Sequence, residues 1–584
     1  MGERLIVEIE RLDASYPSSF NSGKSVFFFH HSGRLQGSDN RVNGVINQVK
    51  QNTMFVTLQA DELPDWMEGN RLGIDLLFDE ASYREMEFAL KKVISGENKR
   101  VEELREILLG NTQPRFDSKT ERKTPHSIFL KIKPAKKILQ AQDVAIVHGP
   151  PGTGKTTTIL AAIQEAVESN LSVLVCAPSN AAVDLLVEKL VDNGIETLRL
   201  GHPARIEEKI LNQTLDAKTA FHASFRDSKN SEKRLINTSN LPSNTSEILA
   251  QRNVLSANSY TTMMREDSKQ LEDYIRFDIF QKTKVFACTL VGASSYHLKG
   301  MNFDLVFIDE AAQGLEAATW IPILKAKKLV LAGDHCQLPP TIKSQTASKD
   351  GLAETLFEKV IQRKPIAAHM LQVQYRMPES IMGFSNSWFY KGNLIADEST
   401  KTHFFLRDEN PLEWIDTAGS GFSDQLEAES LSTFNPEEAR FACKYLNDLI
   451  LQIGIAQFRQ HEWNIGLIAP YGAQVRLLKR LILETYDFPN LKAFADMITI
   501  DTVDGFQGQE RDLMLISLVR SNEKGEIGFL SDTRRMNVAL TRAKRKLVIV
   551  GDSSTLTQHP FFDRLLAYFE EKNAYRSIWE FDLG

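Results

Sequence analysis

The chain has 584 residues, of which 42% are hydrophobic and 25% are charged, and its formal net charge is −7. A single hydrophobic core rarely grows beyond about 250–300 residues, so this length predicts two or more domains. The composition is that of a globular protein and excludes a disordered or fibrous chain. The acidic balance excludes a protein coated with nucleic-acid-binding charge but allows local basic surfaces.

The apolar pattern and the cysteine positions bear on the cellular compartment in which the protein works. No apolar stretch approaches the roughly 20 residues of a membrane span, and the charged N-terminus is unlike a signal peptide. We therefore expect no membrane partner and a cytoplasmic protein, or a nuclear one if the source is eukaryotic. Cys176, Cys288, Cys336 and Cys443 lie far apart. This spacing favours reduced, buried thiols over a zinc site or a disulfide framework.

The first part of the chain differs from the rest. Short β-rich runs at Ser25–Phe29, Val42–Val49 and Thr53–Leu58 are separated by Gly, Asn and Asp, which predicts a small barrel or sheet. From Ser82 to Leu109 the apolar residues recur at helical spacing. Acidic residues outnumber basic ones in 1–110, whereas 121–137 is strongly basic, so the net charge conceals a segregated distribution.

Further along, strand and helix patterns alternate, as parallel α/β sheets require. The first series of apolar strand candidates is Val144–Val147, Leu171–Cys176, Val285–Ala287, Leu305–Ile308 and Leu329–Leu331. The second series is Ile465–Ile468, Ile498–Ile500, Leu513–Leu518 and Leu547–Val550. Two series predict two sheets. The alternation stops between Gly201 and Lys284, which indicates an insertion in the first of them.

A glycine-rich loop follows the first apolar strand and leads into an apolar helix from Ile159. The loop consists of Gly149, Pro150, Pro151, Gly152, Thr153, Gly154, Lys155, Thr156 and Thr157. The order of strand, GxxxxGKT loop and helix is that of a phosphate-binding loop. Its backbone N–H groups would surround a β-phosphate, Lys155 would reach the β and γ oxygens, and Thr156 would hold Mg²⁺.

A second apolar strand, beginning at Phe303, ends in the carboxylates Asp309 and Glu310. At the carboxyl edge of a parallel sheet they would face the nucleotide. Asp309 would order Mg²⁺ and Glu310 would activate the attacking water. Alone, such a run is also an ordinary end of a strand. Together with the phosphate loop it favours an ATP site.

Seven motifs stand in a known order along the chain. They are Gly149–Thr156, Ala177–Asn180, Asp309–Gln313, Gly333–Pro340, Gln374–Met377, Val503–Glu510 and Asn537–Ala543. They resemble the motifs of superfamily 1 helicases, in the 5′→3′ branch that includes the nonsense-mediated-decay and immunoglobulin mu-binding helicases. The resemblance runs from about Val144 to Asp552. It implies an α/β fold with two tandem RecA-like P-loop NTPase domains, an N-terminal β-barrel with helical stalk, and a helical insertion.

The same resemblance divides the chain into domains. Residues 1–110 would form the accessory barrel and stalk helices, and 111–204 with 281–363 the first RecA-like domain. Residues 205–280 would be the helical insertion, and 364–584 the second RecA-like domain.

The resemblance also assigns roles around ATP. It implies that Gln337 senses the γ-phosphate and that Arg376 and Arg542 are arginine fingers, a role in which a guanidinium matches the transferring phosphoryl group. Tyr375 would stack on adenine, with core packing as the alternative. Glu510 would contact the ribose, with a surface ion pair as the alternative. A solvated basic helix face would account for the lysines and arginine of 544–546 but poorly for Arg542.

The resemblance further implies a track for single-stranded RNA or DNA across both domains. The matching residues are Pro178, Ser179, Asn180, Thr289, Pro470, Tyr471, Thr502 and Arg520. Short polar groups suit phosphate contacts without sequence information, and aromatic rings stack on any base. Each position alone could equally be a cap or turn at the end of a strand.

One departure concerns adenine selectivity. The family's glutamine motif would fall about 18 residues before the phosphate loop, where this chain has Leu130–Ile132. We therefore expect ATP and Mg²⁺ as cofactors but leave adenine selectivity open.

These patterns predict an ATP-dependent helicase or translocase that moves 5′→3′ on single-stranded RNA or DNA. We expect a monomer without an obligate protein partner. A first alternative is a nucleic-acid-stimulated ATPase that clamps or remodels ribonucleoprotein without unwinding. A second is a binding module that only retains the nucleotide loop. The choice between RNA and DNA stays open, because it would rest on 2′-hydroxyl contacts.

Overall fold

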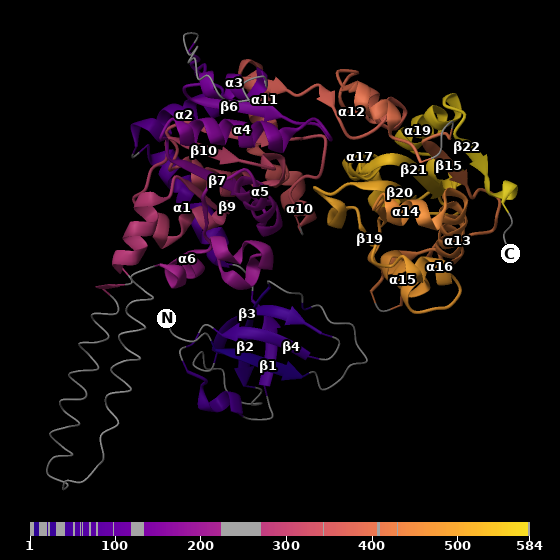
Figure 1. The fold of residues 1–584 in the computed structure, drawn as a ribbon, viewed down its shortest axis with the longest axis horizontal. Helices are drawn as coiled ribbons and strands as arrows, with labels where there is room; N and C mark the ends of the chain where they lie inside the picture. Colours follow the sequence, from indigo (N-terminus) through magenta and orange to yellow (C-terminus); the bar gives the residue numbers. More distant parts are fainter. Residues whose placement is uncertain are drawn as a thin grey trace, which may run out of the picture. The chain divides into compact units, whose positions relative to one another are not determined.

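The computed structural model describes residues 5–10, 20, 24–30, 41–50, 53–58, 60, 62–68, 72–77, 80–96, 98–117, 133–222, 270–271, 273–342, 344–405, 409–428 and 430–581 (Figure 1). The chain divides into two compact units. The first comprises 1–131, 135–144 and 159–331, and the second comprises 132–134, 145–158 and 332–584.

The N-terminal region is an antiparallel sheet. Its strands are β1 (Ile6–Glu10), β2 (Ser25–His30), β3 (Arg41–Val49), β4 (Thr53–Leu58) and β5 (Leu72–Leu76). Among the described residues they pair in the order β1-β4-β3-β2-β5, and Val26, Phe28, Ile46 and Val56 form its buried core. The predicted β-rich runs are confirmed as strands. Because β1 and β5 are the two edges of this order, closure into a barrel is not confirmed.

Two helices follow that sheet and belong to the same unit. Helix α1 (Glu80–Ser95) packs on α9 (Glu316–Ile323), and α2 (Lys99–Leu109) carries Arg100. Arg100 and Arg115 each lie 2.8 Å from Oδ1 of the buried Asp143. Burial acts to raise the pKa of Asp143, but the hydrogen bonds from Arg115 and Arg100 lower it to about 2. The two arginines therefore tie this helical region to the residue that precedes β6.

The first parallel sheet contains the predicted first series of strands. Its strands are β6 (Val144–His148), β7 (Val173–Ala177), β8 (Thr197–Arg199), β9 (Val285–Thr289), β10 (Leu305–Ile308), β11 (Leu329–Gly333) and β12 (Ala368–Met370). In the described residues their order is β12-β6-β11-β10-β7-β9-β8. Every residue of β6, β7, β10 and β11 is buried. Continuous apolar runs are typical of strands covered on both faces.

The second parallel sheet has strands β15 (Leu412–Asp416), β18 (Ile465–Ala469), β19 (Ile498–Thr502), β20 (Arg511–Ser517), β21 (Ala543–Gly551) and β22 (Tyr575–Ser577). Within the described part they pair in parallel in the order β19-β18-β20-β21-β15-β22. Successive side chains along each strand point to opposite faces of the sheet, so two hydrophobic cores form, one on each face. Met514 and Ile549 pack with α12 (Glu379–Phe389), α17 (Thr533–Leu540) and α19 (Pro560–Glu571).

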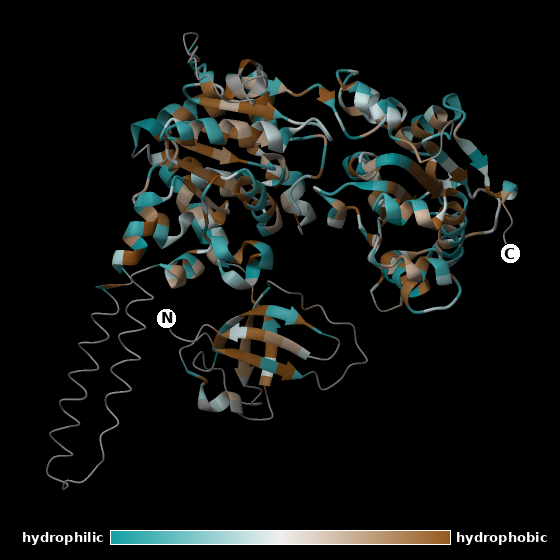
Figure 2. Ribbon diagram, viewed as in Figure 1, coloured by the Kyte–Doolittle hydropathy of each residue, from teal (hydrophilic) through white to brown (hydrophobic). Residues whose placement is uncertain are grey.

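On the opposite face of that sheet, Leu515 and Val548 pack with α13 (Pro436–Ile453) and α15 (Gly472–Leu483). Helices therefore cover both faces of a hydrophobic sheet, whose strands are largely brown in Figure 2. The remaining helices include α3 (Lys133–Gln140), α11 (Leu356–Arg363), α14 (Ile455–Gln460) and α16 (Pro489–Ala493). Two short strand pairs are also present. Strand β13 (Val373–Gln374) pairs with β14 (Ile395–Ala396), and β16 (Gln425–Leu426) pairs with β17 (Thr433–Phe434).

The predicted insertion at 205–280 is only partly covered. The structure describes α6 (Leu215–Phe221) and a helix over residues 273–282. Residues 223–269 lie outside the described residues, as do Leu130–Ile132 and most of the basic segment 121–137. A helical insertion is therefore not confirmed as a whole. None of the helices described is both long and apolar enough for a transmembrane segment.

Candidate functional site

The loop between β6 and α4 (Lys155–Glu168) has a backbone that glycine accommodates best. Gly152 and Gly154 have φ angles of +73° and +77°, in the left-handed region. A Cβ added to Gly149 would lie 2.6 Å from Cβ of Lys155, and one added to Gly152 would lie 2.6 Å from Cβ of Arg376. The loop therefore runs against two residues to which sequence analysis assigns roles at ATP.

Helix α4 begins directly at the end of this loop. Its first backbone N–H groups have no partner within the helix, and the helix dipole adds positive charge there. Thr153 donates its hydroxyl to the carbonyl of Pro150 at 2.7 Å, which holds the turn closed. Lys155 and Thr156 are half-buried and Thr157 is exposed. This arrangement of N–H groups, a lysine and hydroxyls can bind a phosphate.

Asp309 and Glu310 follow β10, as predicted. The Asp309 side chain is buried and accepts the backbone N–H of Glu310 at 2.8 Å. Glu310 has φ +50° and ψ 36°, a left-handed conformation that is uncommon for a residue with a side chain. Its Oε2 accepts a hydrogen bond from Gln313 at 2.6 Å. Such conformations cluster at functional sites, where the surrounding structure maintains them.

Tyr375 and Arg376 lie beside the phosphate loop. The backbone N–H of Tyr375 donates to the carbonyl of Gly152 at 2.9 Å, while the Tyr375 side chain is 56% exposed. Arg376 donates from Nε to Oε2 of Glu510 at 2.7 Å and from Nη1 to the carbonyl of Thr541 at 2.9 Å. Exposure of Tyr375 leaves its ring available for stacking. Glu510, a candidate ribose contact, is here the ionic partner of Arg376.

Electrostatics support that ion pair. Partial burial acts to raise the pKa of Glu510, but the charge and hydrogen bond of Arg376 outweigh it and lower the pKa. Glu510 is therefore ionised near neutral pH and holds the Arg376 guanidinium beside the phosphate loop.

Arg542, between α17 and β21, is 2% exposed and uses all three guanidinium nitrogens. It donates to the carbonyl of Val538 at 3.0 Å, to the carbonyl of Gln509 at 3.1 Å and to Oε1 of Gln337 at 3.0 Å. Gln337 in turn donates from Nε2 to Oδ2 of Asp334 at 2.7 Å. The structure thus brings together the two residues to which γ-phosphate roles were assigned.

Asp334 is a site residue that sequence reasoning missed. It is 3% exposed and accepts hydrogen bonds from His148 at 3.0 Å, from the Tyr390 hydroxyl at 2.7 Å and from Gln337. Burial acts to raise its pKa, but His148 and the other donors lower it. Its position in the Gly333–Pro340 motif was visible in the sequence, although the convergence of its partners was not. Asp334 therefore fixes Gln337 relative to the residue that precedes the phosphate loop.

The proposed nucleic-acid residues of the first parallel sheet lie at strand ends and cap the next element. Ser179 is the N-cap of α5 (Asn180–Asp192), and its hydroxyl accepts from Ala182 N at 3.2 Å. Thr289 accepts from Gly292 N at 3.0 Å, and Asn180 accepts from Arg199 at 2.9 Å. Pro178 is half-buried before the cap. These bonds support the cap alternative while leaving Ser179 exposed at the surface.

In the second parallel sheet, Thr502 is the last residue of β19, and Pro470 and Arg520 follow β18 and β20. Glu510 and Arg542, by contrast, precede β20 and β21. Tyr471 is 5% exposed, and its hydroxyl accepts from Phe529 N at 3.3 Å. Burial favours packing over base stacking for that ring. Arg520 is also buried. It donates to the carbonyl of Glu526 at 2.8 Å and lies 3.2 Å from Asp424, so it joins its own loop to the segment before β16.

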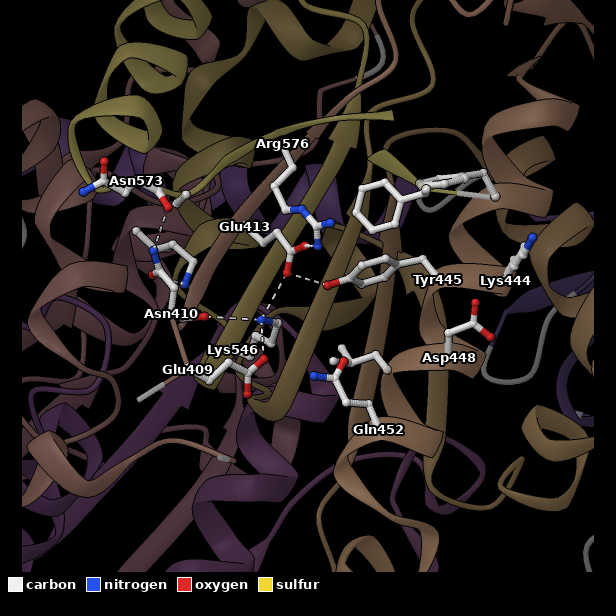
Figure 3. A pocket seen from close by; sticks show the side chains of 15 residues that line it. Glu409, Asn410, Glu413, Lys444, Tyr445, Asp448, Gln452, Lys546, Asn573 and Arg576 are labelled. Carbon is white, nitrogen blue, oxygen red and sulfur yellow. Dashed lines mark hydrogen bonds and ion pairs between the residues drawn. The ribbon is translucent and has the colours of Figure 1, made fainter. Parts of the chain in front are cut away.

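The basic segment after Arg542 is largely neutralised. Lys544 and Arg545 pair with Asp512 at 3.3 and 3.1 Å. Lys546 lies in a recess of about 460 Å³, where Figure 3 shows it beside Glu413 and Glu409. Glu413 also accepts from Tyr445 at 2.6 Å and from Arg576 at 3.2 Å. These charges serve packing of the second unit.

The four cysteines are free thiols, as predicted, and Cys176, Cys288 and Cys443 are buried. Cys176 and Cys288 lie opposite one another on β7 and β9, with their sulfurs 3.8 Å apart. Cys336 is only partly buried and lies beside Asp334 in sequence.

The chain has two parallel α/β sheets. A phosphate loop follows β6 of the first sheet, and the buried Arg542 precedes β21 of the second. These features define a P-loop NTPase with tandem RecA-like sheets. Families described as AAA domain match residues 131–345 and 352–554. The DNA-binding protein SMUBP-2 of Mesocricetus auratus is 35% identical over 97% of this chain and 57% of its own.

Two further relatives carry helicase in their names. The DNA polymerase alpha-associated DNA helicase A of Schizosaccharomyces pombe is 32% identical over 92% of this chain and 81% of its own. An uncharacterized ATP-dependent helicase of Methanocaldococcus jannaschii is 31% identical over 89% and 82%. The chain spans a little over half the length of the SMUBP-2 relatives. It belongs to the superfamily 1 helicases, in the group that includes SMUBP-2 and the regulators of nonsense transcripts.

Proposed function

We propose that this protein hydrolyses ATP at the phosphate loop and uses the energy to move 5′→3′ along single-stranded RNA or DNA and to unwind duplexes. The observation that carries the proposal is the convergence around Gly152 and Gln337. Tyr375 N donates to Gly152 O at 2.9 Å, and Arg542 donates to Gln337 at 3.0 Å. Residues far apart in the sequence thus meet next to the phosphate loop and the γ-phosphate sensor.

In this proposal Lys155 and the loop amides from Gly149 to Thr157 bind the phosphates, and Tyr375 stacks on the base. Glu310 orients and deprotonates the attacking water. Arg376 and Arg542 stabilise the charge on the transferring phosphoryl group, a task for which a planar guanidinium suits better than an ammonium. When ATP binds, Glu510 releases its ion pair with Arg376 and accepts hydrogen bonds from the ribose hydroxyls instead.

Thr156 and Asp309 are the proposed Mg²⁺ residues. A threonine hydroxyl and a buried carboxylate are oxygen donors, the ligand class that Mg²⁺ prefers, so the residues fit the ion. When bound with ATP, Mg²⁺ neutralises charge on the β and γ oxygens. Asp309 is held in place because its Oδ1 accepts the Glu310 N–H.

The strand would follow the strand ends that carry Pro178, Ser179, Asn180, Thr289, Pro470, Tyr471, Thr502 and Arg520. Exposure of Ser179 supports direct phosphate contact there. Burial of Tyr471 and Arg520 supports an indirect part for those two, as residues that shape the loops after β18 and β20.

Strand displacement tests the proposal directly. Duplexes with a 5′ single-stranded tail should be separated in the presence of ATP and Mg²⁺, and duplexes with a 3′ tail should not. Binding should weaken as salt rises, because phosphate contacts release counterions. Strand-stimulated ATP hydrolysis without displacement of either duplex would favour the clamp that remodels ribonucleoprotein. Hydrolysis that no RNA or DNA strand stimulates would favour a binding module.

We also propose the domain division 1–110, 111–204 with 281–363, 205–280, and 364–584, and a monomeric protein without an obligate protein partner. Strand β12, which lies within 364–584, pairs with β6 of the first parallel sheet. Limited proteolysis with mass spectrometry of the fragments tests these limits.

A further inference from the structure

Four metal-ligating side chains meet at the end of β6 and directly after β11. His148 is the last residue of β6, and Asp334, His335 and Cys336 follow β11. One ligand atom from each of these four residues lies within 4.8 Å of the others. We call them the His148–Cys336 cluster. No role in ATP hydrolysis has been assigned above to His335 or Cys336.

The cluster is compact: His148 and Asp334 are buried, and His335 and Cys336 are partly buried. His148 is 9% exposed and Asp334 is 3% exposed. His148 Nε2 lies 3.0 Å from Asp334 Oδ1, and the His148 and His335 ring centroids are 4.7 Å apart. Neighbouring ligand atoms of a tetrahedral zinc ion are separated by roughly 3.3 Å, given metal–ligand distances of about 2.0 Å. The carboxylate–imidazole pair already has nearly that separation.

A second observation points to a ligand. Within the described residues, Nδ1 of His335 is buried without a hydrogen-bond partner. Buried polar groups are nearly always paired, so an orphaned imidazole nitrogen calls for an explanation.

Surrounding groups hold the carboxylate in place. Asp334 Oδ2 accepts from Tyr390 and Gln337, each at 2.7 Å, while Oδ1 faces His148 and the Cys336 N–H at 3.1 Å. Ligands whose remaining lone pairs are hydrogen-bonded are oriented in advance, as at established metal sites. Cys336 Sγ contacts the carbonyl of Phe389 at 3.5 Å, a weak interaction that a metal could replace.

We propose that the His148–Cys336 cluster binds one zinc-class divalent cation through His148, Asp334, His335 and Cys336. Two nitrogens, one oxygen and one sulfur form a donor set that suits zinc and does not suit Mg²⁺. The ion occupies the place of the proton between His148 Nε2 and Asp334 Oδ1. The proton on His148 Nε2 leaves as the nitrogen–metal bond forms, and the neutral imidazole keeps one proton at Nδ1 by exchange with solvent. The Cys336 thiol loses its proton to solvent as the sulfur–metal bond forms.

The position of this cation site suggests its effect. His148 directly precedes Gly149 of the phosphate loop, and Asp334 holds Gln337. A bound ion joins the segments that carry both, and therefore restrains the γ-phosphate sensor. This regulatory consequence rests on the proposed function, whereas metal binding itself does not.

Cobalt titration of the full chain, freed of metal with a chelator, tests binding. One Co²⁺ per chain should produce visible absorption of a tetrahedral site with a thiolate-to-cobalt band, and Zn²⁺ should displace it. Cys336→Ser should remove the thiolate band, and His335→Gln should weaken affinity by at least about tenfold. Cys443→Ser, which alters a buried thiol on α13, is the matched control and should leave the spectrum unchanged.

The outcomes separate the two proposals. Absence of a one-to-one cobalt spectrum, or a thiolate band that persists in Cys336→Ser, would overturn the cation site. If the site is present, micromolar Zn²⁺ at constant Mg²⁺ should inhibit ATP hydrolysis of the wild type but not of Cys336→Ser. Zinc-insensitive hydrolysis in a protein that binds cobalt overturns the regulatory effect. Loss of all hydrolysis in the wild type refutes the proposed function and leaves the cobalt result standing.

Discussion

Arg542 Nη2 donates a hydrogen bond to Gln337 Oε1 over 3.0 Å. The proposed arginine finger and the proposed γ-phosphate sensor are therefore hydrogen-bonded to one another. A γ-phosphate that enters would compete for both groups, because its charged oxygens are stronger acceptors than an amide. Such an exchange would couple the arrival of ATP to a rearrangement of the segment between α17 and β21.

Replacement of Arg542 should affect turnover more than binding. We expect Arg542→Ala to lower kcat for ATP by about 10³-fold or more, as loss of an arginine finger does. Arg542→Lys should restore little, since an ammonium cannot reproduce the fork. Steady-state hydrolysis and equilibrium binding of a fluorescent nucleotide measure the two effects. Arg545→Ala is the control, because Arg545 pairs with Asp512 and packs over Trp463. Equal losses in both variants would contradict the assignment.

The Arg376–Glu510 ion pair predicts a ribose-dependent effect. If Glu510 leaves Arg376 for the ribose, Glu510→Gln should raise KM for ATP about tenfold, the loss of roughly 1.5 kcal/mol of hydrogen bonding to a charged group. KM for 2′,3′-dideoxy-ATP, which lacks the hydroxyls, should change much less. Michaelis constants for both nucleotides decide the matter. An equal rise for the two would show that Glu510 serves Arg376 alone.

Gly152 predicts a strict steric requirement. Gly152→Ala places a Cβ 2.6 Å from that of Arg376 at φ +73°. We expect ATP affinity to fall by at least about tenfold, because the loop must shift away from Arg376. Gly194→Ala is a matched control, since Gly194 has φ +74° and nothing within 4 Å of an added Cβ. It should cost about 1 kcal/mol of stability and leave nucleotide binding intact. Similar binding defects in both would contradict this account.

Glu438 predicts how stability depends on pH. Its carboxyl is fully buried on α13, and burial raises its pKa to about 7, although Ser517 and Val519 donate to it. The folded state thus retains a proton that the unfolded state releases near pH 4.5. Stability from this group is complete below pH 4.5 and is lost as the pH rises through 7.

Glu438→Gln removes that dependence because an amide does not ionise. Between pH 5 and pH 8 the free energy of unfolding of the variant, relative to wild type, should rise by about 3 kcal/mol, or 1.36 kcal/mol for each pKa unit. Urea unfolding across this range provides the measurement. Parallel pH profiles of the two proteins would refute the raised pKa.

Sequence patterns predicted the buried strands well where every residue is apolar. β10 matches its prediction at both ends, and β6 differs by one residue. β8 and β15 were missed because each contains a buried charge. Arg199 in β8 is paired with Asp184 at 2.7 Å, and Glu413 in β15 is bound by Tyr445 at 2.6 Å. Such partners lie far away in sequence, so periodicity cannot reveal them.

The candidate site shows the same limit. The phosphate loop could be predicted from local spacing, since its glycines, Lys155 and Thr156 are contiguous. The convergence on Asp334 could not be predicted in full. Gln337 is only three residues away, but His148 and Tyr390 come from two segments that are distant in sequence. Burial of Tyr471 likewise depends on the loop around Phe529, 58 residues along the chain.

ATP hydrolysis by Lys155 and Glu310 variants tests the central claim most directly. Wild type should hydrolyse ATP and accelerate when single-stranded RNA or DNA is added. Lys155→Ala and Glu310→Gln should each lose turnover by about 10³-fold or more, yet still bind a labelled oligonucleotide. Turnover like that of wild type in either variant would contradict the ATP site proposed here.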